Sequence, residues 1–163
     1  SMTKSTLKKE DVLLLKVQVL YDIEKVLERA LPKLESASFD KGLKGAFKDH
    51  LAETRGHIKK LEKVFEELGE KPKTEKSEGI RGIAADSEWV IKNHSSSLIR
   101  DCMLASGARY AEHYEMAGYL SAIEEAKVLK MPTIVKLLKE NLKEEMAADK
   151  ILAAAVKAAL TYA

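Results

Sequence analysis

The sequence of 163 residues is long enough for one domain with its own hydrophobic core. Its 28 basic and 26 acidic residues leave a net charge of +2, which argues against a nucleic-acid partner. The single cysteine, Cys102, excludes an internal disulfide, and the apolar runs are too short for a membrane span. We therefore expect one domain over residues 1–163 and, because no apolar leader is visible, a cytoplasmic location. Residues 1–6, with Ser1 before Met2, are expected to be disordered or a cloning remnant.

Two long segments in the first half of the chain have the periodicity of amphipathic helices, with apolar residues three and four apart. The first helix is predicted over residues 8–36, where Pro32 should kink or end it. The second is predicted over residues 41–68, with Ser38 or Asp40 as its N-cap. Only a short turn joins them, so they should form an antiparallel hairpin.

A polar stretch follows and leads into a short amphipathic helix predicted over residues 80–92. The third long helix is predicted over residues 98–129, and the fourth from Pro132 to residue 161, because proline fits a first helical turn. Roughly 30 residues separate the second long helix from the third, enough to run the ~42 Å length of such a helix. Two hairpins and one long crossover predict an all-α, ferritin-like four-helix bundle with a short fifth helix in the crossover.

Ionisable side chains interrupt the apolar face of every long helix near its middle. Because burying an unpaired carboxylate is costly, several of them inside one bundle require a compensating charge. Carboxylate oxygens and imidazole nitrogens are good ligands for divalent and trivalent ions, so we expect two metal ions between the helices. The predicted ligands are Glu24, Glu53, His57, Glu112, Glu115, Glu145 and Asp149.

The spacing of these candidates indicates shared helix faces. Glu53 and His57 lie four residues apart, and so do Glu145 and Asp149, so each pair points to one side of its helix. A shift of 92 residues carries the first pair onto the second. This match hints that the second hairpin repeats the first.

The third long helix supplies two candidates three residues apart, Glu112 and Glu115, and the spacing leaves open which is the main ligand. A shift of 91 residues carries Glu24 onto Glu115, a second sign of the repeat. In an alternative interpretation, these carboxylates form an internally paired polar layer in the core. The protein would then be a structural or partner-binding bundle without catalytic turnover.

Four further residues are predicted to support the ligands. His50 lies one turn before a predicted ligand and could be an extra ligand, a partner of a ligand or a packed core histidine. Tyr21 and Tyr119 lie within a turn of glutamate candidates, where they could donate hydrogen bonds or pack as core aromatics. His113 is expected at a helix interface or beside a ligand, and Arg109 in a surface ion pair.

Five stretches of the chain are similar in sequence to a known protein family. They are LYDIEKVLERALPKL (20–34), HLAETRGHIKKLEKVFEELGEKP (50–72), EGIRGIAADSEWVI (78–91), ARYAEHYEMAGY (108–119) and LLKENLKEEMAADKILAAA (137–155). Together they cover nearly the whole chain. At these residues the sequence resembles the YciE/YciF group of ferritin-like bacterial stress proteins.

The resemblance implies a homodimer with a di-iron type of site and an association with oxidative or general stress. Rubrerythrin-like sites of the wider superfamily use two glutamates three apart on the third helix, which Glu112 and Glu115 match. The superfamily pattern Glu-x-x-His on helices two and four is replaced here by Glu53-x-x-x-His57 and by Asp149. The resemblance implies iron as the metal, and this oxygen-rich set leaves manganese or zinc as alternatives.

We therefore expect a non-haem two-metal protein that reacts with a small oxidant such as peroxide or dioxygen, as a ferroxidase or peroxidase would. Disproportionation of peroxide, as in manganese catalases, is a third alternative. The sequence has no Cys-x-x-Cys pair, so any reductant would come from another molecule. Neither a nucleic acid nor a membrane is expected as a partner.

Overall fold

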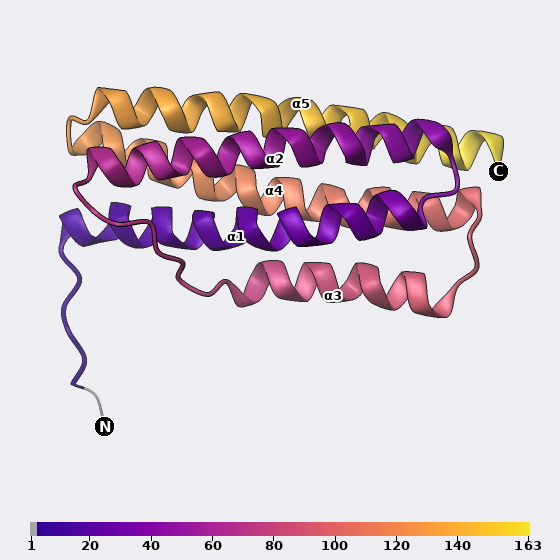
Figure 1. The fold of residues 1–163 in the computed structure, drawn as a ribbon, viewed down its shortest axis with the longest axis horizontal. Coiled ribbons are helices and arrows are strands. Elements are labelled where there is room, and N and C mark those ends of the chain that lie inside the picture. The colour runs from indigo at the N-terminus through magenta and orange to yellow at the C-terminus, as the bar shows by residue number, and fades with distance from the viewer. Residues whose placement is uncertain (1–2) are drawn as a thin grey trace.

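The computed structural model describes residues 3–163, which form five helices and no strand (Figure 1). The helices are α1 (Lys9–Ala37), α2 (Lys41–Glu67), α3 (Glu78–Asn93), α4 (Leu98–Val128) and α5 (Pro132–Tyr162). All five predicted helices are present, and each end lies within two residues of its predicted position. The prediction for residues 1–2 lies outside the described residues, whereas residues 3–8 precede α1 without helical structure.

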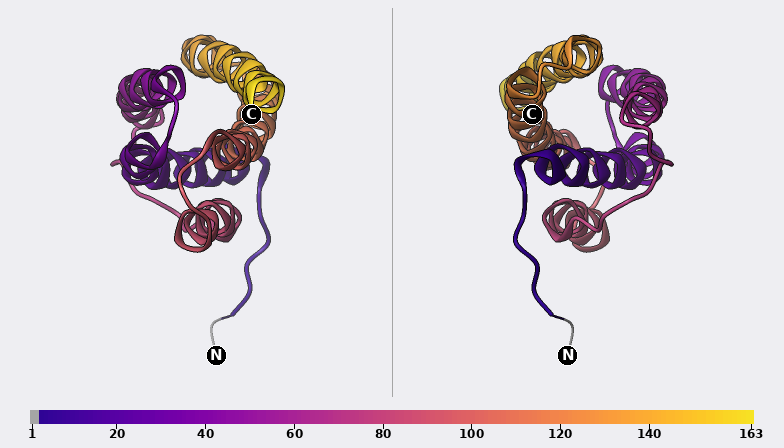
Figure 2. Two further views of the ribbon diagram at one scale, coloured as in Figure 1. Left: turned by 90° about the vertical axis from the view of Figure 1, so that its right-hand side faces the viewer. Right: turned by 90° about the vertical axis from the view of Figure 1, so that its left-hand side faces the viewer.

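The helices form a bundle of two antiparallel hairpins. α1 pairs with α2 and α4 with α5, and the end views show these four helices around a common interior (Figure 2). α3 lies outside the bundle, against α1 and α4, within the crossover that runs along the bundle (Figure 1). The predicted all-α bundle with a crossover helix is confirmed. Among residues 3–163, every helix is too short or too polar to serve as a membrane span.

Capping residues fix the turn between α1 and α2. Asp40, one of the two predicted N-caps, accepts a hydrogen bond from the Leu43 backbone N–H at 3.0 Å. Ser38, the other candidate, instead caps the C-terminal end of α1. α1 continues past Pro32 to Ala37, so this proline does not end the helix.

A buried carboxylate fastens the crossover to the bundle. Asp22 of α1 accepts hydrogen bonds from the Ser77 backbone N–H at 2.7 Å and from two Arg81 nitrogens at 2.5 and 3.1 Å. The Ser77 hydroxyl caps α3 and lies 3.0 Å from the Tyr114 hydroxyl of α4. Burial raises the pKa of Asp22, but the hydrogen bonds from Arg81 and Ser77 outweigh it and lower that pKa overall. One carboxylate thus joins α1 to the beginning of α3.

A second buried carboxylate holds the turn of the first hairpin against α4. Asp101 accepts hydrogen bonds from the backbone N–H groups of Phe39 and Asp40, both at 2.8 Å. The neighbouring Arg100 donates to the Ala37 carbonyl at the end of α1. The two hairpins are therefore tied together near this turn by charge-assisted hydrogen bonds, which are stronger than neutral ones.

Replacing Asp22 with alanine should lower the free energy of unfolding by about 2–3 kcal/mol, because Ser77 and Arg81 would lose their buried acceptor. Urea denaturation measures this change. Glu88→Gln is the control, since it removes an exposed α1–α3 pair with Lys33 and should cost less than about 1 kcal/mol. Equal losses in the two variants would contradict the anchoring role of Asp22.

Candidate metal centre

The second hairpin repeats the burial pattern of the first at one constant spacing. A shift of 91 residues carries the buried His50 and Thr54 of α2 onto the buried Asn141 and Glu145 of α5. The same shift relates the central glutamates of α1 and α4, as the sequence predicted. The shift of 92 predicted for α2 and α5 is therefore wrong by one residue, which corresponds to about 100° of rotation around a helix.

The centre of the bundle holds four glutamates and two histidines, each less than a tenth exposed. They are Glu24 of α1, His50 and His57 of α2, Glu112 and Glu115 of α4, and Glu145 of α5. Five of the seven predicted ligands are thus brought together. The sixth member is His50, for which the sequence left open the roles of extra ligand, partner of a ligand and packed core histidine.

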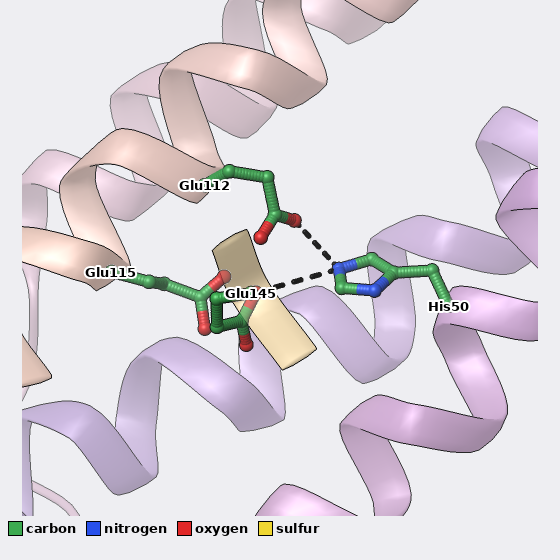
Figure 3. A group of neighbouring side chains, drawn as sticks. All are labelled: His50, Glu112, Glu115 and Glu145. Carbon is green, nitrogen blue, oxygen red and sulfur yellow. Dashed lines mark ion pairs between the residues drawn. The ribbon is translucent and has the colours of Figure 1, made fainter. Parts of the chain in front are cut away.

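One half of this cluster consists of His50, Glu112, Glu115 and Glu145 (Figure 3). His50 Nε2 lies 2.6 Å from Glu112 Oε1 and 3.8 Å from Glu145 Oε2. Each of the four residues offers a ligand atom within 4.8 Å of those of the other three. Ligands on opposite sides of one ion, each at ~2.0–2.2 Å, are separated by comparable distances. This half could therefore hold one metal ion.

The other half consists of Glu24, His57 and again Glu145. His57 Nδ1 lies 2.8 Å from Glu145 Oε1 and 3.4 Å from Glu24 Oε1. Because Glu145 belongs to both halves, its carboxylate could supply a ligand to each of two ions. Two divalent ions would also balance the four negative charges of the glutamates.

Many buried polar atoms of the cluster lack a conventional partner. Among the described residues, both oxygens of Glu115 and of Glu145 and Nδ1 of His57 accept or donate no hydrogen bond. The short nitrogen–oxygen contacts given above do not have hydrogen-bond geometry. An unsatisfied buried polar group costs about 1–3 kcal/mol, and a charged one costs more. This donor set therefore fits a cation, which would satisfy all of these atoms at once.

The pKa values of three side chains in the cluster are strongly shifted. Burial and the neighbouring carboxylates of Glu145 and Glu24 raise the pKa of Glu115 well above its usual range. Burial and the contact with Glu112 raise the pKa of Glu145 to about 7. Burial alone would lower the pKa of His57, but Glu145 and Glu24 raise it to about 10. Without cations the cluster therefore retains protons, which bound metal ions would displace.

A short hydrogen-bonded chain orients Glu24. The Tyr119 hydroxyl donates to Glu24 Oε1 at 2.8 Å, one of the two roles considered for it from the sequence. Asn141 Nδ2 donates to the Tyr119 hydroxyl at 3.1 Å and to the His57 carbonyl at 3.3 Å. Asn141 was not predicted, although a polar amide on an apolar stripe could have signalled it. Tyr21 lies elsewhere and donates to Glu62 at 2.9 Å.

Besides Tyr21, three predicted site residues lie outside the cluster. The carboxylate of Asp149 accepts a hydrogen bond from Arg109 Nε at 2.8 Å and lies 3.1 Å from His113 Nε2. The structure thus does not bring Asp149 or His113 to the centre, and the ion pair predicted for Arg109 is made with Asp149 of the neighbouring helix. The side chain of Glu53 is 37% exposed and lies beside His50 on the outer side, with Oε2 3.5 Å from Nδ1.

Comparison with known proteins agrees with this architecture. The family described as "Domain of unknown function (DUF892)" matches residues 8–162. The chain is 38% identical to Protein YciF of Escherichia coli (strain K12) over 141 residues, which cover 86% of this chain and 85% of YciF. The crystal structure of the E. coli stress protein YciF has a TM-score of 0.92 at 34% identity and covers 97% of this chain and 100% of that chain.

Two other solved structures have the same arrangement of helices. YcfI from Rhodopseudomonas palustris, whose description as a structural protein is provisional, has a TM-score of 0.90 at 30% identity, covering 94% of this chain and 98% of that one. A ferritin-like, diiron-carboxylate protein from Bacillus anthracis has a TM-score of 0.72 and covers 93% of this chain and 99% of that one. Because the two sequences are only 16% identical, this match is evidence for the fold alone. The predicted ferritin-like fold is confirmed.

Metal-free protein should lose stability as the pH rises from about 5 to about 9. The folded pKa values of Glu145 (about 7) and His57 (about 10) exceed their ordinary values of 4.5 and 6.5. In this window the folded chain therefore binds more protons than the unfolded chain, and its free energy of unfolding falls with pH. Thermal unfolding with a chelator at several pH values measures the slope. A melting temperature higher at pH 8.5 than at pH 5.5 would contradict this prediction.

Proposed function

We propose that this chain, which belongs to the DUF892 family, is a non-haem two-metal carboxylate protein of the ferritin-like class. The observation that carries the proposal is the position of Glu145, which belongs to two groups of buried histidine and glutamate side chains. Iron is the proposed metal, with manganese or zinc as alternatives, because di-iron and di-manganese bundles use this mixture of four glutamates and two histidines. The diiron-carboxylate description of the B. anthracis neighbour supports the choice.

Each ion is assigned its own set of ligands, with Glu145 shared between them. The first would bind His50, Glu112, Glu115 and Glu145, and the second would bind Glu24, His57 and Glu145. Both histidines come from α2, seven residues and therefore about two turns apart. In the superfamily pattern the histidines come from two different helices. In this chain both imidazoles would come from α2, with His50 binding the first ion and His57 the second.

The proposed reaction is the reduction of a small oxidant, peroxide or dioxygen, as in a ferroxidase or peroxidase. Two ferrous ions bound in the centre would supply two electrons. Tyr119 fixes the orientation of Glu24, and the surrounding apolar side chains limit the access of water. His57 Nε2 lies 3.1 Å from Oε1 of the half-exposed Glu144, which holds the imidazole with Nδ1 toward Glu145.

The proposed setting of this reaction is a cytoplasmic homodimer linked to oxidative or general stress. The description of YciF as a stress protein supports the link. A structural or partner-binding bundle without turnover is the second candidate, supported by the description of YcfI. The two candidates differ in one measurable property, because only the first requires metal in the bundle.

Glutamine variants of the ligands should lower the number of bound ions in a specific pattern. After anaerobic equilibration with iron(II), elemental analysis of wild type should give two ions per chain. Glu145→Gln should lose both, whereas Glu24→Gln and Glu112→Gln should each lose one, because only Glu145 is shared. Asp149→Asn is the matched control and should keep two, since Arg109 and His113 hold this carboxylate away from the centre. Wild type without iron would favour the structural alternative.

Glu115→Gln should act in opposite directions with and without metal. In chelator at pH 8 it should raise the free energy of unfolding by about 2 kcal/mol, because it removes a fully buried carboxylate whose oxygens lack partners. With iron(II) present it should be less stable than wild type, because a ligand is lost. Differential scanning calorimetry under both conditions checks the reversal, and destabilisation in both would contradict it.

A further inference from the structure

A groove of about 330 Å³ lies between α2 and α5 and reaches His50 at the edge of the candidate centre. Small residues open it, among them Gly45 and Ala46 of α2 and Ala148 of α5. Lys41 and the acidic Asp49 and Glu53 also line it. The groove is thus a wide, polar-rimmed approach to the cluster.

His50 separates this groove from the centre. Its Nε2 faces inward, 2.6 Å from Glu112 Oε1 (Figure 3), and its Nδ1 lies 3.5 Å from Glu53 Oε2 on the other side. The side chain is only 8% exposed, and within residues 3–163 neither ring nitrogen has a partner with hydrogen-bond geometry. The buried imidazole therefore lacks a hydrogen-bond partner and lies between Glu53 of the groove and Glu112 of the cluster.

The groove also carries negative charge where a cation would first arrive. Asp49 and Glu53 lie four residues apart on α2, so their carboxylates share one side of the helix. Glu53 is partly exposed and also contacts His50, which places it between solvent and the buried ligands. Carboxylates on a concave surface raise the local concentration of cations and their rate of association.

A second cavity reaches His50 and Glu112 from the opposite direction, beneath α3, but it does not suit a hydrated ion. Its volume is about 30 Å³, room for about one water molecule. Leu27, Leu31 and Ile80 are among the apolar residues that line it. Moving a charged ion through such a passage would remove its water without replacing it by oxygen ligands.

We propose that divalent cations reach the candidate centre through the α2–α5 groove, with Asp49 and Glu53 as a transient outer site and His50 as the gate. This inference rests on the proposed function. A hydrated cation would exchange some of its water for carboxylate oxygens in the groove. Rotation of the His50 side chain toward the groove would then pass the ion from Glu53 to Glu112. The assignment also gives Glu53 a role that its position outside the ligand cluster permits.

Stopped-flow mixing with Co²⁺, followed by the visible absorption of the bound ion, measures this route without requiring catalysis. Glu53→Gln should slow uptake about tenfold at low salt and less at high salt, with the final number of bound ions unchanged. Glu66→Gln removes the same charge from an exposed position of α2 away from the groove and should not slow uptake.

A steric variant tests the same route without changing charge. Gly45→Leu should fill the groove and slow uptake, since a Cβ added there meets no atom within 4 Å and the helix tolerates leucine. Gly56→Leu, at an equally open position that does not line the groove, should leave the rate unchanged.

The outcomes separate this inference from the proposed function. Full occupancy with equal rates in the Glu53 and Gly45 variants and their controls would overturn the route and leave the metal centre intact. Loss of an ion at equilibrium in Glu53→Gln would make Glu53 a permanent ligand and would also overturn it. A wild type that takes up no Co²⁺ would refute the proposed function and the route together.

Discussion

The interior of this bundle is governed by the cost of placing four carboxyl groups where water does not reach them. Other buried carboxylates of the chain are supplied with donors: Asp22 by Arg81 and Ser77, and Asp101 by two backbone N–H groups. In the described part of the chain, the central glutamates meet only two imidazoles and one tyrosine hydroxyl. Protons can relieve this deficit, at the expense of stability at higher pH. Two divalent cations would relieve it fully, which is why we connect the stability of the fold to metal binding.

The connectivity of the helices gives this centre one covered side and one open side. α3 covers the face formed by α1 and α4, where Asp22 holds its first turn and an apolar cavity remains beneath it. The opposite pair, α2 and α5, is separated by the groove that ends at His50. Both histidines of the cluster lie on α2, and one of them, His50, lines this groove. The crossover therefore contributes to the site indirectly, because it leaves the α2–α5 side as the wide approach.

The fold could be predicted from the sequence because its helices are long, strongly periodic and separated by polar breaks. The site was harder, because residues three and four apart share a helix face and spacing alone does not separate a shift of 91 from one of 92. The four-residue spacing of Glu53 and His57 matched that of Glu145 and Asp149 and so suggested the shift of 92. The two histidines that are buried together on α2 are instead His50 and His57. Asp149 was misplaced for another reason: its carboxylate is held by Arg109 of α4, and helical periodicity does not predict contacts between helices.

Anomalous X-ray scattering from crystals soaked anaerobically in iron(II) tests the central claim most directly, because it locates the cations themselves. Two peaks should lie inside the bundle on either side of the Glu145 carboxylate, one next to His50 and the other next to His57. A bundle interior without peaks at saturating iron(II) would contradict the account. So would iron bound only on the outer surface, beside Asp149 and His113.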